Sequence, residues 1–445
     1  MPGATVSPLT KAASAVRHSA AKSAPLTTFQ KLAPTGGGRE LNSLTASPQL
    51  KEWYMKTSSA IGRGAIRPAS IARLNRCSSE WNEAQALGVA DLLYAAGAHT
   101  SAIWKRYTEG DGTPRDLPVG YLLPGVRGTL NLQHPVACQA LLDAAAKDGA
   151  VVQRGVRDVV VLPGTIPRVS YWFGGRRFQV DASLVVGADG RGSAVRRSAG
   201  ITLEEQEATT WVAGMLLQQV SGGQAHDVVL EHDLGMCLLV HQGGGRARAY
   251  HIVPLEHRTR YVGDRGAERF LADATQPGSP LAETLAHARP AGPCACVPGT
   301  DTWTDQPYAE GIVLIGDAAG HNDPSVGCGL SIAMRDVRLV RDLVLGGARH
   351  AEDFAPYGRE RAERMKRLRL IGDLIAATSV ESHQNRRARR QHLAQAMATM
   401  DSQIAPVLLG MFAGLETIPA ALINDSVLAR IRAVGDHSID IALTQ

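Results

Sequence analysis

The sequence lacks several features that would place it in a specialised class of proteins. None of its apolar runs approaches the roughly 18–20 residues of a membrane-spanning helix, so we expect no membrane span. Its six cysteines show neither the spacing of a disulfide framework nor a paired CxxC zinc pattern. This absence favours a reducing, cytoplasmic location and no metal site. The composition is otherwise that of an ordinary globular chain, and 445 residues suffice for two or three domains.

Acidic residues are almost missing from the first 76 residues. That segment holds eleven Lys or Arg against only Glu40 and Glu52, so it alone carries a charge of +9. The whole chain carries +5, which leaves the remainder at −4 and argues against a nucleic-acid partner. Neither a helical nor a strand period persists in residues 1–76. We therefore expect an atypical N-terminal segment that is disordered, mis-translated or used for targeting.

The chain changes character after residue 76 and shows alternating helix and strand signals. Helical spacing covers residues 81–97, and a second helix with an early Pro135 is expected to stop at Gly149. Strands follow at 156–162 and 170–180, the latter turning at Gly174-Gly175. Residues 201–300 contain short alternating runs between glycine-rich turns, which indicates an inserted antiparallel sheet.

The C-terminal part is predicted to be helical. Five apolar residues lie on one predicted helix face: Leu330, Ala333, Val337, Val340 and Val344. Two basic helices are expected near 355–378 and 384–399. The second contains an arginine run of Arg386, Arg387, Arg389 and Arg390. No aromatic residues are interleaved with this run, so a solvated helix face is favoured over an RNA site.

One motif with chemical meaning follows a short apolar strand at 312–315. Gly316 and Asp317 come directly after this strand, where α/β sheets bind ligands, and a carboxylate there can accept hydrogen bonds from sugar hydroxyls. Pro324, Gly327, Cys328, Gly329 and Leu330 then lead into a helix. Uncapped N–H groups at a helix N-terminus suit an electron-rich ring that becomes negative on reduction. The alternative is a purely structural strand–loop–helix connection.

A second motif, "GADGRGS", follows the strand-forming residues 184–186. Glycines at a strand end let the backbone pass close to a ligand, and Asp189 and Arg196 could address ribose or phosphate. Asp189-Gly190 is also a common turn pair, so a plain turn is an equal interpretation of this motif alone. Four tryptophans could line a substrate pocket, although buried packing is their commoner role: Trp104, Trp172, Trp211 and Trp303.

Together, "VVGADGRGSAVRR" and "GIVLIGDAAGHNDPSVGCGLSIAMRD" resemble the DG and GD motifs of the FAD-dependent class A monooxygenases with the para-hydroxybenzoate hydroxylase fold. The resemblance covers roughly residues 78–415. It implies an α/β fold with a Rossmann-like FAD-binding domain, an antiparallel-sheet substrate domain and a helical C-terminus. The implied domains are 77–200 and 301–346 for the two parts of the FAD-binding domain, 201–300 for the substrate domain and 347–445 for the helical region.

The resemblance also implies a cofactor site. Asp317, next to Gly316, would bind the ribityl chain of FAD. The isoalloxazine ring would lie against the loop formed by Pro324, Gly327, Cys328, Gly329 and Leu330. Asp189, Gly190 and Arg196 would take part in binding FAD and NAD(P)H, and His134 would lie near the flavin from another side.

One part of the family pattern is missing from the sequence. The family begins with a strand and a GxGxxG turn that holds the FAD pyrophosphate, followed by an acidic residue that binds ribose. The glycines at 36–38 and at 62 and 64 follow no strand signal, so the first βαβ unit is expected to be absent. A mis-translated start, a divergent chain without tight FAD binding and a targeting segment are the competing explanations, and the first is favoured.

The implied function is that of an FAD-dependent oxidoreductase, a monooxygenase that takes electrons from NAD(P)H and inserts oxygen from O₂ into a small organic substrate. The cofactor supplies the difficult chemistry, so no catalytic side chain is assigned. One alternative is a degenerate flavoprotein without activity that acts as a binding protein or has no function. A halogenase or reductase on the same fold is disfavoured, because no additional motif supports it. The substrate and the oligomeric state cannot be derived from the sequence.

Overall fold

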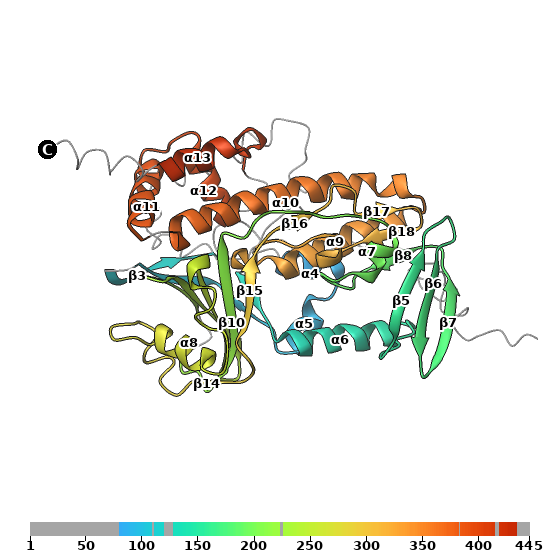
Figure 1. The fold of residues 1–445 in the computed structure, drawn as a ribbon, viewed down its shortest axis with the longest axis horizontal. Helices are drawn as coiled ribbons and strands as arrows, with labels where there is room; N and C mark the ends of the chain where they lie inside the picture. Colours follow the sequence, from blue (N-terminus) through green and yellow to red (C-terminus); the bar gives the residue numbers. More distant parts are fainter. Residues whose placement is uncertain are drawn as a thin grey trace, which may run out of the picture. The chain divides into compact units, whose positions relative to one another are not determined.

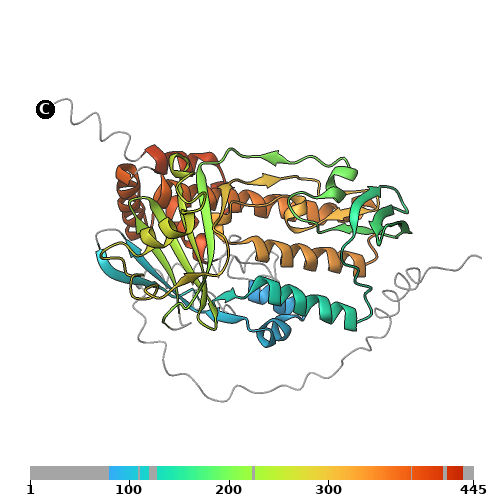
Figure 2. The same cartoon turned by 60° about the horizontal axis from the view of Figure 1, so that its bottom comes forward.

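The computed structural model describes residues 80–433 apart from 109–110, 120–127, 223–225, 382 and 414–417. The chain divides into two units, Met1–Asn75 and Arg76–Gln445, and every described residue lies in the second. The predicted atypical segment 1–76 and the predicted absence of the first βαβ unit therefore lie outside the described residues. Within the second unit, the largest sheet lies at one end of helices α9 and α10, and strands β5–β8 lie at the other (Figures 1 and 2).

The largest sheet has eight strands within the described residues. Its order is β14-β10-β13-β12-β11-β2-β3, and β15 also pairs with β10. The strands are β2 (Ile103–Thr108), β3 (Asp111–Leu117), β10 (Thr210–Gln218), β11 (His226–His232), β12 (Gly235–Gly243), β13 (Arg246–Pro254), β14 (Arg289–Pro290) and β15 (Ala295–Gly299). All neighbours are antiparallel except β2 and β11. The antiparallel sheet predicted for 201–300 is therefore present, with β2 and β3 added to it.

The two faces of this sheet have different environments, because side chains alternate along each strand. One face packs against helix α8 (Gly266–Ala274) and forms a core that includes Met215, Leu217, Leu239 and Phe270. Each such buried apolar side chain stabilises the fold by roughly 1.5–3 kcal/mol. The opposite face turns toward the C-terminal helices and forms the floor of a cavity. The sheet therefore separates a closed core from a ligand-sized space.

The two strands that precede the motif loops are parallel neighbours. Strand β8 (Val185–Gly187) lies beside β18 (Ile312–Leu314), with Val186 opposite Val313. Strand β17 (Tyr308–Ala309) pairs with β18 on its other side. The remaining strands form three small sheets: β5 (Arg157–Leu162), β6 (Arg168–Phe173) and β7 (Arg176–Asp181) form a meander, β1 (His99–Ser101) pairs with β4 (Thr129–Asn131), and β9 (Glu204–Glu205) pairs with β16 (Thr302–Trp303). The β8–β18 pairing places the ends of both motif strands side by side.

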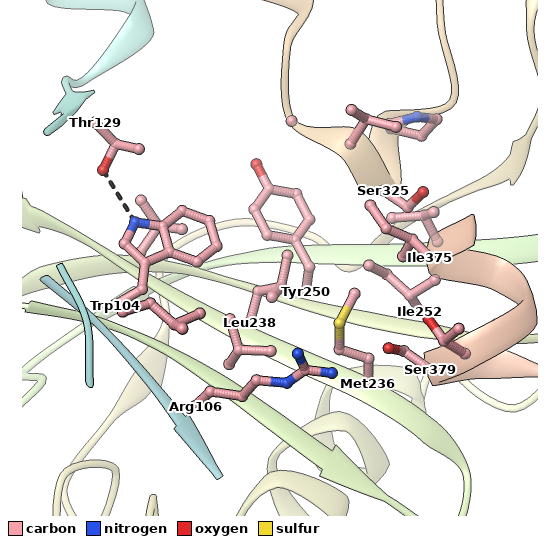
Figure 3. Close-up of a pocket in the computed structure, with 18 of the residues that line it drawn as sticks. Trp104, Arg106, Thr129, Met236, Leu238, Tyr250, Ile252, Ser325, Ile375 and Ser379 are labelled. Carbon is pink, nitrogen blue, oxygen red and sulfur yellow. Dashed lines mark hydrogen bonds between the residues drawn. The ribbon is translucent and has the colours of Figure 1, made fainter. Parts of the chain in front are cut away.

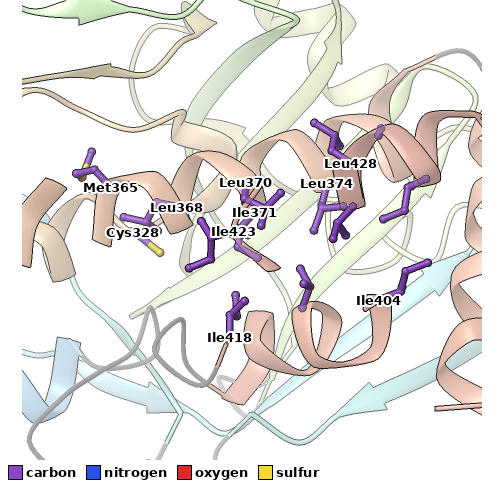
Figure 4. Packing of buried hydrophobic residues seen from close by; sticks show 14 of the residues in the cluster. Cys328, Met365, Leu368, Leu370, Ile371, Leu374, Ile404, Ile418, Ile423 and Leu428 are labelled. Carbon is purple, nitrogen blue, oxygen red and sulfur yellow. The ribbon is translucent and has the colours of Figure 1, made fainter. Parts of the chain in front are cut away.

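Helices surround these sheets. They are α4 (Glu80–Leu87), α5 (Ala90–Ala95), α6 (His134–Lys147), α7 (Ala194–Ser198), α9 (Gly329–Leu345), α10 (Ala355–Ile375), α11 (His383–Ala398), α12 (Ile404–Ala413) and α13 (Asp425–Ala433). Apolar residues of α10, including Leu368, Ile371 and Leu374, pack against Ile404 and Leu428 of the last helices (Figure 4). Among the described helices, none is long and apolar enough to cross a membrane.

The predicted α/β class, with its antiparallel sheet and helical C-terminal region, is confirmed, and two local predictions need correction. The helix expected over 81–97 is broken at Gly88, whose φ of 75° lies in the left-handed region. On α9, the predicted face is wrong at Val337, which is 38% exposed. Arg335 and Asp336 of the same helix are buried instead. Ion pairs described below account for the burial of these two charged residues.

Candidate cofactor and substrate site

The loop after β18 is held directly at the end of a fully buried strand. Ile312, Val313 and Leu314 are completely buried, and the chain then enters a short 3₁₀ turn at Gly316–Ala319. The carboxylate of Asp317 stays 40% exposed there. The strand therefore anchors the backbone of the turn and leaves the carboxylate of Asp317, the residue predicted to bind the ribityl chain, accessible.

Glycine is required at two positions in the following loop. Gly320 has a φ of 108°, and a Cβ at this position would lie 2.3 Å from the carbonyl oxygen of Thr302. Gly327 has a φ of 72° and ends a second 3₁₀ turn, Pro324–Val326. Helix α9 then starts at Gly329, and the N-cap residue Cys328 makes no side-chain capping hydrogen bond. The positive end of the α9 dipole at this turn favours a ligand with partial negative charge.

A buried guanidinium group and a buried carboxylate bind the backbone of this loop, and we call this arrangement the clamp. Arg361 of α10 donates hydrogen bonds to the carbonyl oxygens of Ala319 (2.9 Å), Gly316 (3.1 Å) and Gly320 (2.8 Å). It also forms an ion pair with Asp336 of α9 (3.0 Å), whose carboxylate accepts a hydrogen bond from the backbone N–H of Gly316 (2.9 Å). The side chains of Arg361 and Asp336 are both 0% exposed. Two helices thereby fix the backbone on both sides of Asp317.

Further charges complete the clamp. Arg364 reaches the second oxygen of Asp336 (2.7 Å), and Arg335 pairs with Glu360 (2.6 Å). Burial alone would raise the pKa of Asp336, but Arg361 and Arg364 hold that pKa below its usual value. The sequence analysis did not identify these residues, because their partners lie 25 or more positions away along the chain.

The loop after β8 is held by local contacts instead. The carboxylate of Asp189 accepts hydrogen bonds from the hydroxyl of Ser193 (2.5 Å) and from the backbone N–H groups of Ala194 (2.7 Å) and Val195 (3.2 Å). Burial would raise the pKa of Asp189, but these hydrogen bonds hold it below its usual value. Asp189 thus caps α7, and Gly190 provides the left-handed turn with a φ of 74°.

The structure brings the two motif loops together. Arg191 approaches Asp317 at 3.4 Å, and both side chains remain partly exposed. Arg196 donates hydrogen bonds to the carbonyl oxygens of Ala318 and Arg191, both at 3.1 Å. The carbonyl contacts of Arg196 cross-link the loops, whereas the partly exposed Arg191–Asp317 pair contributes little to stability.

A cavity of about 1280 Å³ lies between the large sheet, the loop before α9 and the C-terminal helices. Its floor carries Met236, Leu238, Tyr250 and Ile252, and Ile375 of α10 faces them (Figure 3). Trp104 lies at one side, where its indole N–H donates a hydrogen bond to the hydroxyl of Thr129 (3.2 Å). The volume exceeds the range of ordinary small-molecule pockets, roughly 300–1,000 Å³, so it can hold a ring system and a substrate together.

Four of the predicted cofactor residues line this cavity: His134, Pro324, Gly327 and Leu330. The other predicted residues do not line it: Gly316, Asp317, Cys328, Gly329, Asp189, Gly190 and Arg196. The site therefore has two parts, a pair of linked loops around Asp317 and a cavity that begins at Pro324. Trp104 is the only one of the four tryptophans considered above that lines the cavity, and Trp172 is exposed on the β5–β7 meander.

The arginine run of α11 departs from the prediction of a solvated face. Arg386 and Arg389 are buried, and Arg389 donates a hydrogen bond to the carbonyl oxygen of Ala377 (3.2 Å). Arg390 forms an ion pair with the buried Glu231 of β11 (2.6 Å), and Arg387 is exposed and lines the cavity. The run joins α11 to the sheet because buried carbonyl and carboxylate oxygens are available there.

Comparisons with known proteins agree with this architecture. No curated protein sequence matches the chain. Among solved structures, a flavoprotein/dehydrogenase from Cytophaga hutchinsonii has a TM-score of 0.61 at 16% identity, covering 82% of this chain and 88% of the other. HpxO of Klebsiella pneumoniae, solved with FAD and uric acid, has a TM-score of 0.58 at 18% identity, covering 77% and 87%. The flavin-dependent halogenase CmlS has a TM-score of 0.58 at 17% identity, covering 82% and 70%.

At these identities, the similarity concerns the fold alone. The family model described as "FAD binding domain" matches residues 85–369, which is more than half of the chain and includes both motif loops. The chain therefore belongs to the FAD binding domain family and is, by family, an FAD-dependent oxidoreductase.

Proposed function

We propose that this protein is an NAD(P)H-using, FAD-dependent monooxygenase that inserts one oxygen atom from O₂ into a small organic substrate. The observation that carries the proposal is the junction at Pro324–Gly327, where the loop after Asp317 opens into the cavity. A cofactor ring bound at this junction would face a substrate-sized, mostly apolar space. In this proposal, residues 77–200 and 301–346 form the FAD-binding part, 201–300 the substrate part and 347–445 the helical region.

The described residues fit the ribityl and ring portions of FAD. Asp317 would accept hydrogen bonds from the ribityl hydroxyls, and Arg361 and Asp336 keep the backbone of Asp317 fixed for this contact. The uncapped first turn of α9 would stabilise negative charge on the ring, and His134 would border the ring from α6. Asp189 would act by shaping the loop that carries Gly190 and Arg191. When bound, FAD supplies electron transfer from NAD(P)H and the activation of O₂.

The protein's own contribution is to orient the reactants and exclude water. Leu238, Met236 and Ile252 give the cavity an apolar floor, and α10 and α11 cover it from the other side. Excluding water protects reactive oxygen species on the enzyme from unproductive breakdown. No side chain is required to form a covalent bond with the substrate, so we assign no catalytic nucleophile.

The test is an FAD titration of the full chain, followed by measurement of NAD(P)H oxidation and O₂ consumption. Quenching of flavin fluorescence should saturate as FAD is added and thereby give a Kd. Asp317→Ala should weaken FAD binding about tenfold or more. Asp148→Ala, which removes an exposed carboxylate at the end of α6, is the matched control and should leave the Kd unchanged. A chain that folds but gives no saturable FAD binding would favour the degenerate flavoprotein and reject the proposal. When a substrate that the enzyme converts is available, a product heavier by one oxygen atom supports the proposal. A halogenated product would reject it in favour of a halogenase.

A further inference from the structure

Two carboxyl groups are buried next to each other beside the turn that opens into the cavity. Asp301 lies between β15 and β16, and Asp323 directly precedes the Pro324–Val326 turn. These two residues are only 5% and 6% exposed. Both lie against Gly372 of α10, where an added Cβ would be 3.8 Å from the Cβ of Asp323 and 4.0 Å from Oδ2 of Asp301. The two side chains therefore belong to one buried site.

The two carboxyl groups have unequal hydrogen-bond donors. Asp323 accepts hydrogen bonds from the backbone N–H of Ser325 (2.7 Å) and from the hydroxyl of Thr210 (3.3 Å). Asp301 faces the backbone N–H of Asp323, and its Oδ1 atom has no hydrogen-bond partner among the described residues. Donors stabilise a buried carboxylate, and a buried carboxylate that lacks them is costly. The negative charge is therefore favoured on Asp323 and a proton on Asp301.

The charged groups around the pair compensate it only in part. Arg369 and Asp373 of α10 face Asp301 with opposite charges. The guanidinium carbon of Arg369 lies 3.9 Å from the centre of the Trp303 ring. Four carboxylates share this guanidinium: Asp301, Asp305, Glu204 and Asp373. Burial lowers the pKa of His321 to about 4, so this neighbour of the pair is uncharged near pH 7. One shared cation is too little for both buried carboxyl groups to ionise at low cost.

Adjacent buried carboxyl groups hold a proton that a single exposed carboxyl group would release, because two like charges at short range repel each other. Burial and the charge of Asp323 raise the pKa of Asp301 to about 7, in agreement with this expectation. In the protonated form, the hydroxyl of Asp301 can donate a charge-assisted hydrogen bond to Asp323. When the proton is released to water, repulsion replaces this hydrogen bond. The change acts on Asp323, whose carboxylate holds the backbone N–H of Ser325.

The Pro324–Val326 turn carries this change to the cavity, because the turn forms part of the cavity wall, where Figure 3 shows Ser325. We propose that Asp301 and Asp323 are positioning residues that share one proton, and that this proton keeps the turn in the shape that receives the cofactor ring. This inference rests on the proposed function, because the same turn is expected to border that ring. The cofactor-binding form holds the proton more tightly, so the affinity is highest below about pH 6 and falls as the pH rises through about 7.

The shared proton is tested in the full chain without FAD. Infrared difference spectra between about pH 6 and about pH 8 should show the loss of the C=O stretching band of a protonated carboxyl group. Asp301→Asn, which keeps a donor toward Asp323 and has no proton to release, should reduce this band. Asp148→Asn, which changes an exposed carboxylate at the end of α6, is the control and should leave the band unchanged. No band in the wild-type protein, or an equal band in Asp301→Asn, would overturn the proposal.

The effect of the proton on the turn is read by amide hydrogen exchange, again without FAD. At about pH 8, peptides that cover 321–328 should exchange about threefold more slowly in Asp301→Asn than in the wild-type protein, and at about pH 6 the two proteins should agree. Equal exchange at about pH 8 would show that the pair does not hold the turn and would overturn the proposal.

The effect on the cofactor is read from the Kd for FAD. From about pH 6 to about pH 8, this Kd should rise about tenfold in the wild-type protein and less than about twofold in Asp301→Asn. A wild-type Kd that does not change with pH would overturn this inference and leave the proposed function intact. A chain that binds no FAD at any pH would reject the proposed function, whereas the infrared and exchange measurements would still decide the state of the pair.

Discussion

The two motif loops follow neighbouring parallel strands, but they are fixed by different kinds of contact. In the loop after β8, the carboxylate of Asp189 binds groups no more than six positions further along the chain. In the loop after β18, backbone groups of 316–320 bind Asp336 and Arg361, which lie on two separate helices. The first loop can form as a local unit. The second takes its shape only when α9 and α10 are packed, so its geometry depends on the whole fold.

The strongest test of this difference is Arg361→Leu. The change removes one donor from each of three carbonyl oxygens and leaves Arg364 as the only remaining ion-pair partner of Asp336 among the described residues. We expect a loss of about 3–5 kcal/mol in the free energy of unfolding, measured by urea denaturation. Arg359→Leu, at an exposed position of the same helix, should cost less than about 0.5 kcal/mol. Equal costs for the two variants would show that the clamp does not hold the loop.

The second test concerns pH, because buried carboxylates lie under the loop after β18. Burial and the neighbouring Asp323 raise the pKa of Asp301 to about 7, and one oxygen of Asp301 has no hydrogen-bond partner among the described residues. A pKa raised above its unfolded value means that the native state holds the proton more tightly. The associated stability is present below pH 4 and is lost as the pH rises toward 7, by up to about 1.4 kcal/mol per pH unit.

Asp301→Asn should therefore flatten the stability–pH curve between pH 4 and 8 and raise stability at pH 8 by up to about 3 kcal/mol. Thermal unfolding at a series of pH values would measure it. Asp305→Asn, which changes an exposed carboxylate on the same segment, serves as the control. A wild-type curve without a decline between pH 5 and 8 would refute this account of Asp301.

The smallest expected effect belongs to the local loop. Asp189→Ala removes the hydrogen bonds that start α7 and should cost about 1 kcal/mol of unfolding free energy. The pKa of Asp189 is lowered in the native state, so this contribution is present above about pH 4 and is lost as the pH falls further. Asp189→Asn should retain part of it, since an amide oxygen still accepts hydrogen bonds. A cost as large as that of Arg361→Leu would remove the distinction between the loops.

The same difference explains what the sequence could predict. The helix α6, with Pro135 in its first turn and Gly149 after its end, follows from local rules, and so do the hairpin at Gly174-Gly175 and the turn at Gly190. On α9, Val337 was predicted to be buried but is exposed, and the burial of Arg335 and Asp336 could not be predicted because these residues pair with residues of α10. Strand partners fix β2 and β3 in the same way. Their segments are rich in charged residues and have no clear alternation, and β2 pairs with β11, more than 100 positions away.

The candidate site divides along this line as well. Glycine, proline and the carboxylate at the end of β18 indicate a ligand-binding loop without any knowledge of the fold. The sequence could not show that arginines from four elements line one cavity, because β2, β3, β13 and α11 contribute them separately: Arg106, Arg115, Arg248, Arg387 and Arg390. The arginine run of α11 was the nearest signal, and its side chains were expected in solvent. The ion pair with Glu231, a buried residue of β11, holds Arg390 in the cavity wall.

The central claim is that the loop after β18 and the start of α9 hold FAD. Amide hydrogen exchange of the full chain, measured by mass spectrometry with and without saturating FAD, tests it most directly. The account predicts slower exchange in peptides that cover 313–331 and, to a smaller extent, at the start of α6 near His134. FAD binding that leaves exchange in 313–331 unchanged would contradict the account.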